Sequence, residues 1–167
     1  MDSNNNLLHA IDHLIVASRI RDLSHYALGD REVRIQRLGS VLSRLPEGWF
    51  LIGVGPHCSE IIKVGSDPIT IGRAASLNEE PLDAVIDYAV NDATLLGPRE
   101  VSRLHVSVRL SSEGDAIEVR DESSSTGTCL VPTDDPFPPE EWTGLGDGQG
   151  FCLGPSGVNV FVVLKIE

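Results

Sequence analysis

The stretch VSRLHVSV, residues 101–108, places a serine and a histidine three positions apart, as a catalytic nucleophile and its base could be. The alternating valines that follow predict a strand, and residues three apart in a strand point to opposite faces. No G-x-S-x-G elbow occurs, because GPSGV at 154–158 has the wrong spacing. We therefore predict that Ser102 and His105 are not a catalytic pair and that the protein is not an enzyme.

The sequence also lacks the residue patterns that a metal or cofactor site requires. His9 and His13 are four apart on a predicted helix, but the stretch HAIDH has no zincin glutamate and no third ligand nearby. The three cysteines, at 58, 129 and 152, form no C-x-x-C pair and are typical of reduced thiols in a cytoplasmic protein. The glycine-rich GLGDGQGFCLG at 144–154 fits no nucleotide-binding pattern and is predicted to be a turn. We expect neither a metal nor a cofactor.

Three short stretches carry residues suited to another chemistry, the binding of a phosphate group. They are IGR at 71–73, SRLH at 102–105 and DESSSTGT at 121–128, and each adjoins a predicted strand. A forked cation with short neutral donors suits a phosphate and requires no general base. The stretches supply the guanidinium of Arg73, turn N–H groups around Gly127 and several hydroxyls, those of Ser102, Ser124, Ser125 and Thr126.

Such a site needs elements that bring the stretches together, and from Trp49 onward the sequence predicts short strands. Turn residues separate the runs WFLIGV, EIIKV, ITIG, AVIDYAV, LHVSVRL, AIEVR, GTCLV, GFCLG and NVFVVLKI. Many short strands without alternating helices are typical of a β-sandwich, in which the loops at one end lie together. Two insertions, one between Arg73 and Ser102 and one at 131–142, are predicted to be surface loops.

The order of these stretches resembles the forkhead-associated (FHA) domain, a phosphothreonine-binding β-sandwich with the pattern G-R … S-R-x-H … D-x-x-S-x-N-G-T. Gly72–Arg73, Ser102–His105 and Asp121–Thr128 follow this pattern in sequence. Downstream, residues 145–154 resemble the family's L-x-x-G-D-x-I-x-L-G turn, and NVFVVLKI resembles its closing strand. The resemblance covers about residues 49–167. It implies an all-β sandwich of the FHA/SMAD-like class that binds proteins and is not an enzyme.

The resemblance also implies roles for individual residues. Arg73 and Ser102 would hold the phosphate, with Ser125 as a further hydroxyl donor. Arg103 and Thr126 would lie along the peptide backbone. The other matching residues would support the site structurally, with the histidine ring tying neighbouring loops together: Gly72, His105 and Gly127.

Two features depart from the family pattern. Thr126 replaces the asparagine of N-G-T, and because an amide donates and accepts at once, this change is expected to weaken or redirect the grip on the peptide main chain. The separation of Arg73 and Ser102 is also longer than the family's usual spacing. Arg99 and Glu100 carry opposite charges just before Ser102, so the sequence leaves open whether this loop attracts or repels an acidic peptide.

Residues 1–48 have a different pattern from the rest of the chain. Apolar residues recur at helical spacing over about 7–27 and over 33–45, with a break at Gly29–Asp30 and an end at Pro46. We predict an N-terminal α-helical hairpin over roughly residues 5–45, followed by the sandwich at 49–167. Arg31, Arg34 and Arg37 would form a stripe on the second helix, as a solvated face or a partner surface.

The charge distribution limits the partners. The formal net charge is −12, and because acidic and basic residues balance over 1–48, residues 49–167 carry all of it. Such a domain is expected to repel nucleic acid, whose binding requires a basic face. No apolar run approaches about 18 residues, so we expect no membrane span.

Together these expectations describe a phosphothreonine-dependent protein-binding module that acts as a signalling adaptor in the cytoplasm. Its partner would be a phosphothreonine-containing protein, either a Ser/Thr kinase or a kinase substrate. One alternative is a degenerate FHA scaffold that binds partners without phosphate, with the N-terminal helices mediating assembly. Another is a hairpin that docks on DNA or protein under control of the β domain. The oligomeric state stays open.

Overall fold

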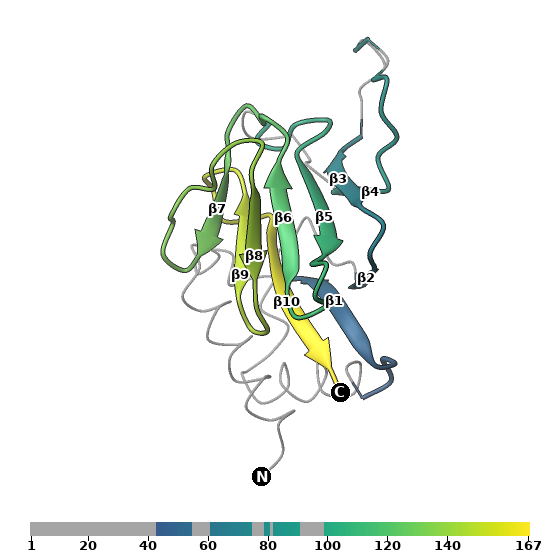
Figure 1. Cartoon of the computed structure of the whole chain (residues 1–167). Helices are drawn as coiled ribbons and strands as arrows, with labels where there is room; N and C mark the ends of the chain where they lie inside the picture. Colours follow the sequence, from purple (N-terminus) through teal and green to yellow (C-terminus); the bar gives the residue numbers. More distant parts are fainter. Residues whose placement is uncertain (1–42, 55–60, 75–78, 81, 91–98) are drawn as a thin grey trace.

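The computed structural model describes residues 43–54, 61–74, 79–80, 82–90 and 99–167. The helical hairpin predicted over residues 5–45 lies almost entirely outside these described residues. Every regular element within them is a strand, and the strands form two five-stranded sheets (Figure 1). The two-sheet β-sandwich predicted from the sequence is therefore confirmed.

The first sheet has the strand order β2-β1-β10-β9-β7. Its strands are β1 (Gly48–Gly53), β2 (Ile61–Val64), β7 (Thr128–Val131), β9 (Gly150–Leu153) and β10 (Val160–Ile166). The second sheet has the order β4-β3-β5-β6-β8. Its strands are β3 (Ile69–Arg73), β4 (Tyr88–Val90), β5 (Val106–Leu110), β6 (Ile117–Asp121) and β8 (Trp142–Leu145). All pairs within the sheets are antiparallel except β3 with β4, which is parallel.

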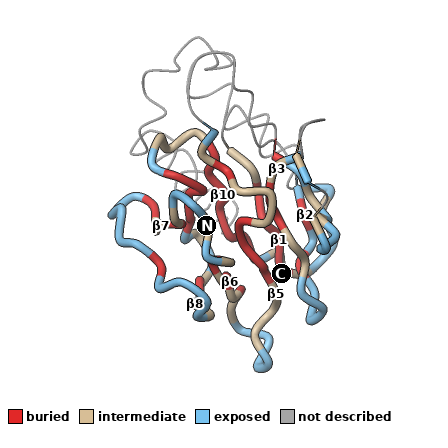
Figure 2. Tube along the Cα trace, turned by 90° about the horizontal axis from the view of Figure 1, so that it is seen from above, coloured by how far each residue is buried: buried red, intermediate tan, exposed pale blue. Residues whose placement is uncertain are grey.

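The core lies between the two sheets and consists mainly of branched aliphatic and phenylalanine side chains. The rings of Phe151 and Phe161 stack with their centroids 5.5 Å apart. Leu51 from the first sheet and Ile71 and Val119 from the second are fully buried in the same cluster. In Figure 2 the buried residues run through the centre of the sandwich and the exposed ones lie in the turns. Apolar residues on strands of both sheets therefore form one continuous core.

Residues 131–142 do more than form the predicted surface loop. Phe137 is only 8% exposed, and its ring lies 6.4 Å from that of Phe151. The stretch then continues into β8, a strand that the sequence did not indicate, because WTGL has one glycine and no apolar alternation. Pairing with β6 along its whole length makes it a strand.

Within the part of the chain that the structure describes, no helix has the length and hydrophobicity needed to cross a bilayer.

Candidate functional site

Three segments meet at one end of the sandwich, at the top of Figure 1. They are the end of β3, the approach to β5 at residues 99–105 and the β6–β7 loop at residues 122–127. Backbone bonds connect them, because Arg73 N–H donates to the Ser102 carbonyl (3.1 Å) and His105 N–H donates to the Ile71 carbonyl (3.0 Å). The three stretches that the sequence singled out are therefore neighbours in space.

Gly72 allows the approach of the first two segments. A Cβ atom at this position would lie 1.9 Å from the carbonyl oxygen of Arg103 and 3.0 Å from that of Ser102. These are backbone atoms that cannot rotate away, so only glycine lets β3 and the 102–103 turn come this close. The support role predicted for Gly72 thus has a steric basis.

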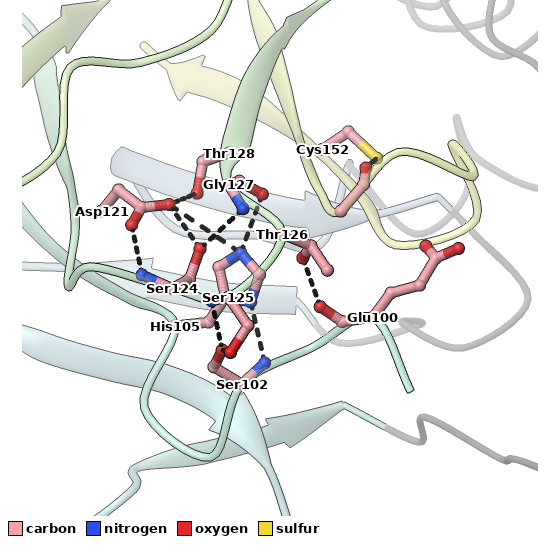
Figure 3. A network of polar contacts seen from close by, with 11 residues as sticks. Glu100, Ser102, His105, Asp121, Ser124, Ser125, Thr126, Gly127, Thr128 and Cys152 are labelled. Atoms are coloured by element: carbon pink, nitrogen blue, oxygen red, sulfur yellow. Dashed lines mark hydrogen bonds and ion pairs between the residues drawn. The ribbon is translucent and has the colours of Figure 1, made fainter. Parts of the chain in front are cut away.

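His105 joins the second segment to the third. Its ring is completely buried, Nδ1 accepts the Ser102 N–H (3.0 Å), and Nε2 lies 3.1 Å from the Gly127 carbonyl oxygen, to which it donates as the neutral Nε2–H tautomer (Figure 3). Since Nδ1 is occupied by a backbone N–H, the ring is not placed to deprotonate the Ser102 hydroxyl. The geometry is that of a loop connector and not of a general base.

Asp121 shapes the β6–β7 loop from inside. Its buried carboxylate accepts the Ser124 N–H (2.7 Å), the Ser124 hydroxyl (2.8 Å) and the Thr128 hydroxyl (2.5 Å). The Ser124 oxygen in turn accepts the Gly127 N–H (3.0 Å), and Gly127 has a φ of +81°, which glycine adopts without strain. Ser124, one of the hydroxyls predicted as a phosphate donor, is thus engaged inside the loop.

Ser102 and Ser125 lie side by side at the mouth of the site. The Ser102 oxygen accepts the Ser125 N–H (3.0 Å), and the two hydroxyl oxygens are 3.4 Å apart (Figure 3). Ser125 is exposed and Ser102 half-buried. The structure therefore brings together the two hydroxyls that the sequence assigned to the phosphate.

Thr126 forms a contact within the domain. Its hydroxyl donates to the Glu100 carbonyl (2.5 Å) and so connects the β6–β7 loop to the segment before β5. The Glu100 carboxylate accepts the Ser156 N–H (3.2 Å), so this side chain is held toward the 154–157 turn. Thr126 and Glu100 thus act on loop geometry, a relation that no sequence signal indicated.

Arg73 presents its guanidinium to a carboxylate of the same chain. Nη1 donates to Glu79 Oε2 (2.8 Å) and Nη2 to Glu79 Oε1 (2.5 Å), which is the bidentate geometry that guanidinium groups form with carboxylates and phosphates. The Arg73 side chain is 12% exposed and that of Glu79 27%, so the pair is partly shielded from water. Sequence reasoning missed Glu79, which lies within the long insertion after β3.

Two further arginines approach the same acidic segment. Arg99 Nη1 lies 3.4 Å from Glu79 Oε2, and Arg103 Nη1 donates to the Glu80 carbonyl. Three guanidinium groups therefore converge on residues 79–80 within a domain of strongly negative charge. Guanidinium groups and short hydroxyls are residue types suited to binding an oxyanion.

Among the described residues, no three His, Cys, Asp or Glu side chains lie close enough together to hold an ion.

No family model and no curated protein matches the sequence. Solved structures do match. The FHA domain of an Arabidopsis thaliana hypothetical protein is 24% identical, with 72% of this chain and 87% of that chain covered and a TM-score of 0.53. The FHA domain of the CT664 protein from Chlamydia trachomatis is 15% identical, with 71% and 98% covered and a TM-score of 0.51.

A third match is the N-terminal FHA domain of Rad53p from S. cerevisiae, solved in complex with a phosphothreonine peptide. It is 17% identical, with 71% of this chain and 94% of that chain covered and a TM-score of 0.50. The chain described here has the FHA-domain fold, as its motifs predicted.

Proposed function

We propose that the protein is a phosphothreonine-dependent protein-binding module and acts as a signalling adaptor. The observation that supports this most directly is the bidentate grip of Arg73 on the Glu79 carboxylate, beside the paired hydroxyls of Ser102 and Ser125. A carboxylate has the charge and fork geometry of two phosphate oxygens, so a guanidinium that holds one in this way is oriented to hold the other.

The partner follows from the same chemistry. The site offers cations and hydroxyls for one phosphate, and Arg103 lies where it can reach a main-chain carbonyl, as it does with Glu80. We infer a phosphorylated protein segment, from a Ser/Thr kinase or one of its substrates, in the cytoplasm. The acidic body of residues 49–167 disfavours nucleic acid as an alternative polyanion.

Fluorescence anisotropy with a degenerate phosphothreonine peptide library tests this proposal. Wild type should bind phosphothreonine peptides in preference to phosphoserine and unphosphorylated versions. Arg73→Ala should lose about ten- to a hundredfold in affinity, because a hydrogen bond to a charged group contributes roughly 1.5–3 kcal/mol.

Arg109→Ala is the matched control for Arg73→Ala. Arg109 is also ion-paired to a glutamate, with Nε 2.7 Å from Glu118 Oε2, but it lies on β5 away from the site. Equal binding by the wild type and both variants, or binding indifferent to phosphate, would contradict the proposal.

The alternative is a scaffold of FHA fold that binds partners without phosphate. Two contacts favour this alternative. The Arg73 guanidinium is already paired with the Glu79 carboxylate, and the Thr126 hydroxyl donates to the Glu100 carbonyl. The Arg73→Ala comparison separates the two functions, because only the phosphate-dependent module loses its partner.

A further inference from the structure

The first sheet is apolar on its outer face as well as on its core face. Phe50 pairs with Leu164 across β1 and β10, Ile52 pairs with Val162, and Val160 pairs with Cys152 across β10 and β9. Directly paired residues point to the same side of a sheet, so these pairs share one face. All members of this outer cluster are at most 7% exposed: Phe50, Ile52, Val131, Cys152, Val160, Val162 and Leu164.

The intervening residues belong to the opposite face. Leu51 pairs with Val163, Phe161 pairs with Phe151, and all four lie in the core between the sheets. β10 is consequently buried on both faces, with five consecutive buried residues from Val160 to Leu164. Strands of an antiparallel sheet with one solvated face alternate between apolar and polar residues, and β10 does not.

The outer face of the second sheet has the usual polar character. Arg109 pairs with Glu118 across β5 and β6, and Arg120 pairs with Trp142 across β6 and β8. The Arg109 guanidinium lies 4.0 Å from the centre of the Trp142 ring, and its Nε bonds Glu118. Only the first sheet therefore has an outer face that needs a covering layer.

The contact of Leu45 with the outer cluster points to the segment that covers this face of the first sheet. Leu45 packs against the outer cluster, and it is the last residue of the apolar series Val33, Leu38, Val41, Leu42 and Leu45 with helical spacing. β1 begins three residues later at Gly48, so residues 1–42 are joined through the chain to a residue that contacts this face. A segment tethered this closely has a high effective concentration at the sheet, which favours it over a second molecule.

We propose that residues 5–42 dock on the outer face of the first sheet through their own apolar stripes and form a third layer of the domain. The dimensions agree, because a helix of about 15 residues is about 22 Å long and a seven-residue strand spans about 23 Å. The apolar residues Leu7, Ile11 and Leu14 recur at the spacing of one helix face. In this arrangement residues 1–48 are an integral part of the sandwich and not a free docking arm.

Photo-crosslinking of the full chain tests the proposal. A benzophenone amino acid replaces Ile166, a half-buried residue that packs against the outer cluster. A control chain carries it in place of Arg109, on the outer face of the second sheet. Equal amounts of ¹⁴N- and ¹⁵N-labelled protein are mixed before irradiation, and the products are mapped by mass spectrometry.

Crosslinks from position 166 to residues 5–42 within one isotopic species, and none to that segment from position 109, are the expected result. Crosslinks that join the two isotopic species would assign the face to a second copy and overturn the proposal. Crosslinks from position 166 confined to residues 43–167 would overturn it as well.

A second measurement uses the Cys152 thiol as a reporter, because it is 2% exposed within this face. Ile11→Asp introduces a charge at the centre of the predicted apolar stripe, whereas His13→Asp does so on the opposite side of the same predicted helix. We expect Cys152 alkylation in the full chain to become about tenfold faster or more in Ile11→Asp and to stay near the wild-type rate in His13→Asp. Equal rates in both variants would contradict the docking.

Discussion

At the scale of single residues, Glu79 gives the site a property that the motifs do not suggest. Its carboxylate accepts hydrogen bonds from both terminal nitrogens of Arg73 and also contacts Arg99. A phosphate that binds Arg73 must therefore displace it. Under the proposed function, this displacement would lower the affinity for phosphate below the value that the arginines alone would give. It would also disfavour weakly charged ligands, because they cannot compete with a carboxylate already in place.

Neutralising this carboxylate should tighten phosphopeptide binding. We expect Glu79→Gln to raise affinity about fivefold, since a partly exposed ion pair contributes up to about 1 kcal/mol. Glu80→Gln is the matched control, with the same change of charge one residue away on an exposed residue that contacts Arg103 through its backbone carbonyl. Isothermal titration of both variants with one phosphothreonine peptide measures the difference, and equal affinities would show that Glu79 does not compete.

At the scale of elements, the site depends on how closely β3 approaches the turn before β5. This approach is possible because glycine at position 72 has no side chain. The buried ring of His105 then connects that turn to the β6–β7 loop. Arg73 ends β3, and the other proposed binding residues lie on loops whose positions are fixed by these buried contacts. Such a division between exposed binding groups and a rigid scaffold is common in binding domains.

Gly72→Ala should therefore both destabilise the fold and weaken the site. The added Cβ would overlap the Arg103 carbonyl, and overpacking of this kind costs about 1–3 kcal/mol. Gly65→Ala is the control, because a Cβ there meets nothing within 4 Å. Urea unfolding gives the free energy of each variant, and similar values for the two would mean that the 102–103 turn yields easily.

At the scale of the whole molecule, the two sheets differ in the polarity of their outer faces. The second sheet presents paired charges and an arginine-stacked tryptophan to solvent, whereas the first is apolar on both sides. The sandwich is thus asymmetric, with the proposed phosphate site at its end and an apolar outer face on one side. The proposed binding site and the proposed docking face are separate surfaces, so we expect that each can be altered without the other.

Burial in the first sheet also makes stability depend on alkaline pH. The hydrogen bond with Cys129 and burial raise the pKa of the Cys152 thiol above its usual range. The unfolded thiol ionises near pH 8.5 while the folded one stays protonated, so the folded state binds more protons and stability falls as pH rises above about 8.5. Urea unfolding at pH 7.5 and 9.5 should show this loss for wild type and a smaller loss for Cys152→Ala. Equal losses would contradict a raised pKa in the folded state, because the thiol would then ionise alike in both states.

The sequence alone was sufficient for the class of fold and for the three blocks that meet at one end of the sandwich. Strand runs and turn residues are local patterns, and the blocks around Arg73, Ser102 and Asp121 are readable in order because each combines close residues with distinct chemistry. The sequence missed β8, because that strand owes its form to pairing with β6 and not to its own composition. It also counted Ser124 among the available hydroxyls, although that hydroxyl bonds to Asp121.

Only the tertiary structure decided how the side chains are paired. Arg73 contacts Glu79, and Thr126 bonds Glu100, although these partners are separated in the chain. The burial of β10 on both faces likewise depends on residues from other elements. Which charged groups and hydroxyls pair depends on the distance between them and on their shielding from water in the folded chain. Neither quantity can be read from the spacing of residues in the sequence. The motifs therefore determine which groups reach the site, and the packing of the loops determines which of them a ligand can use.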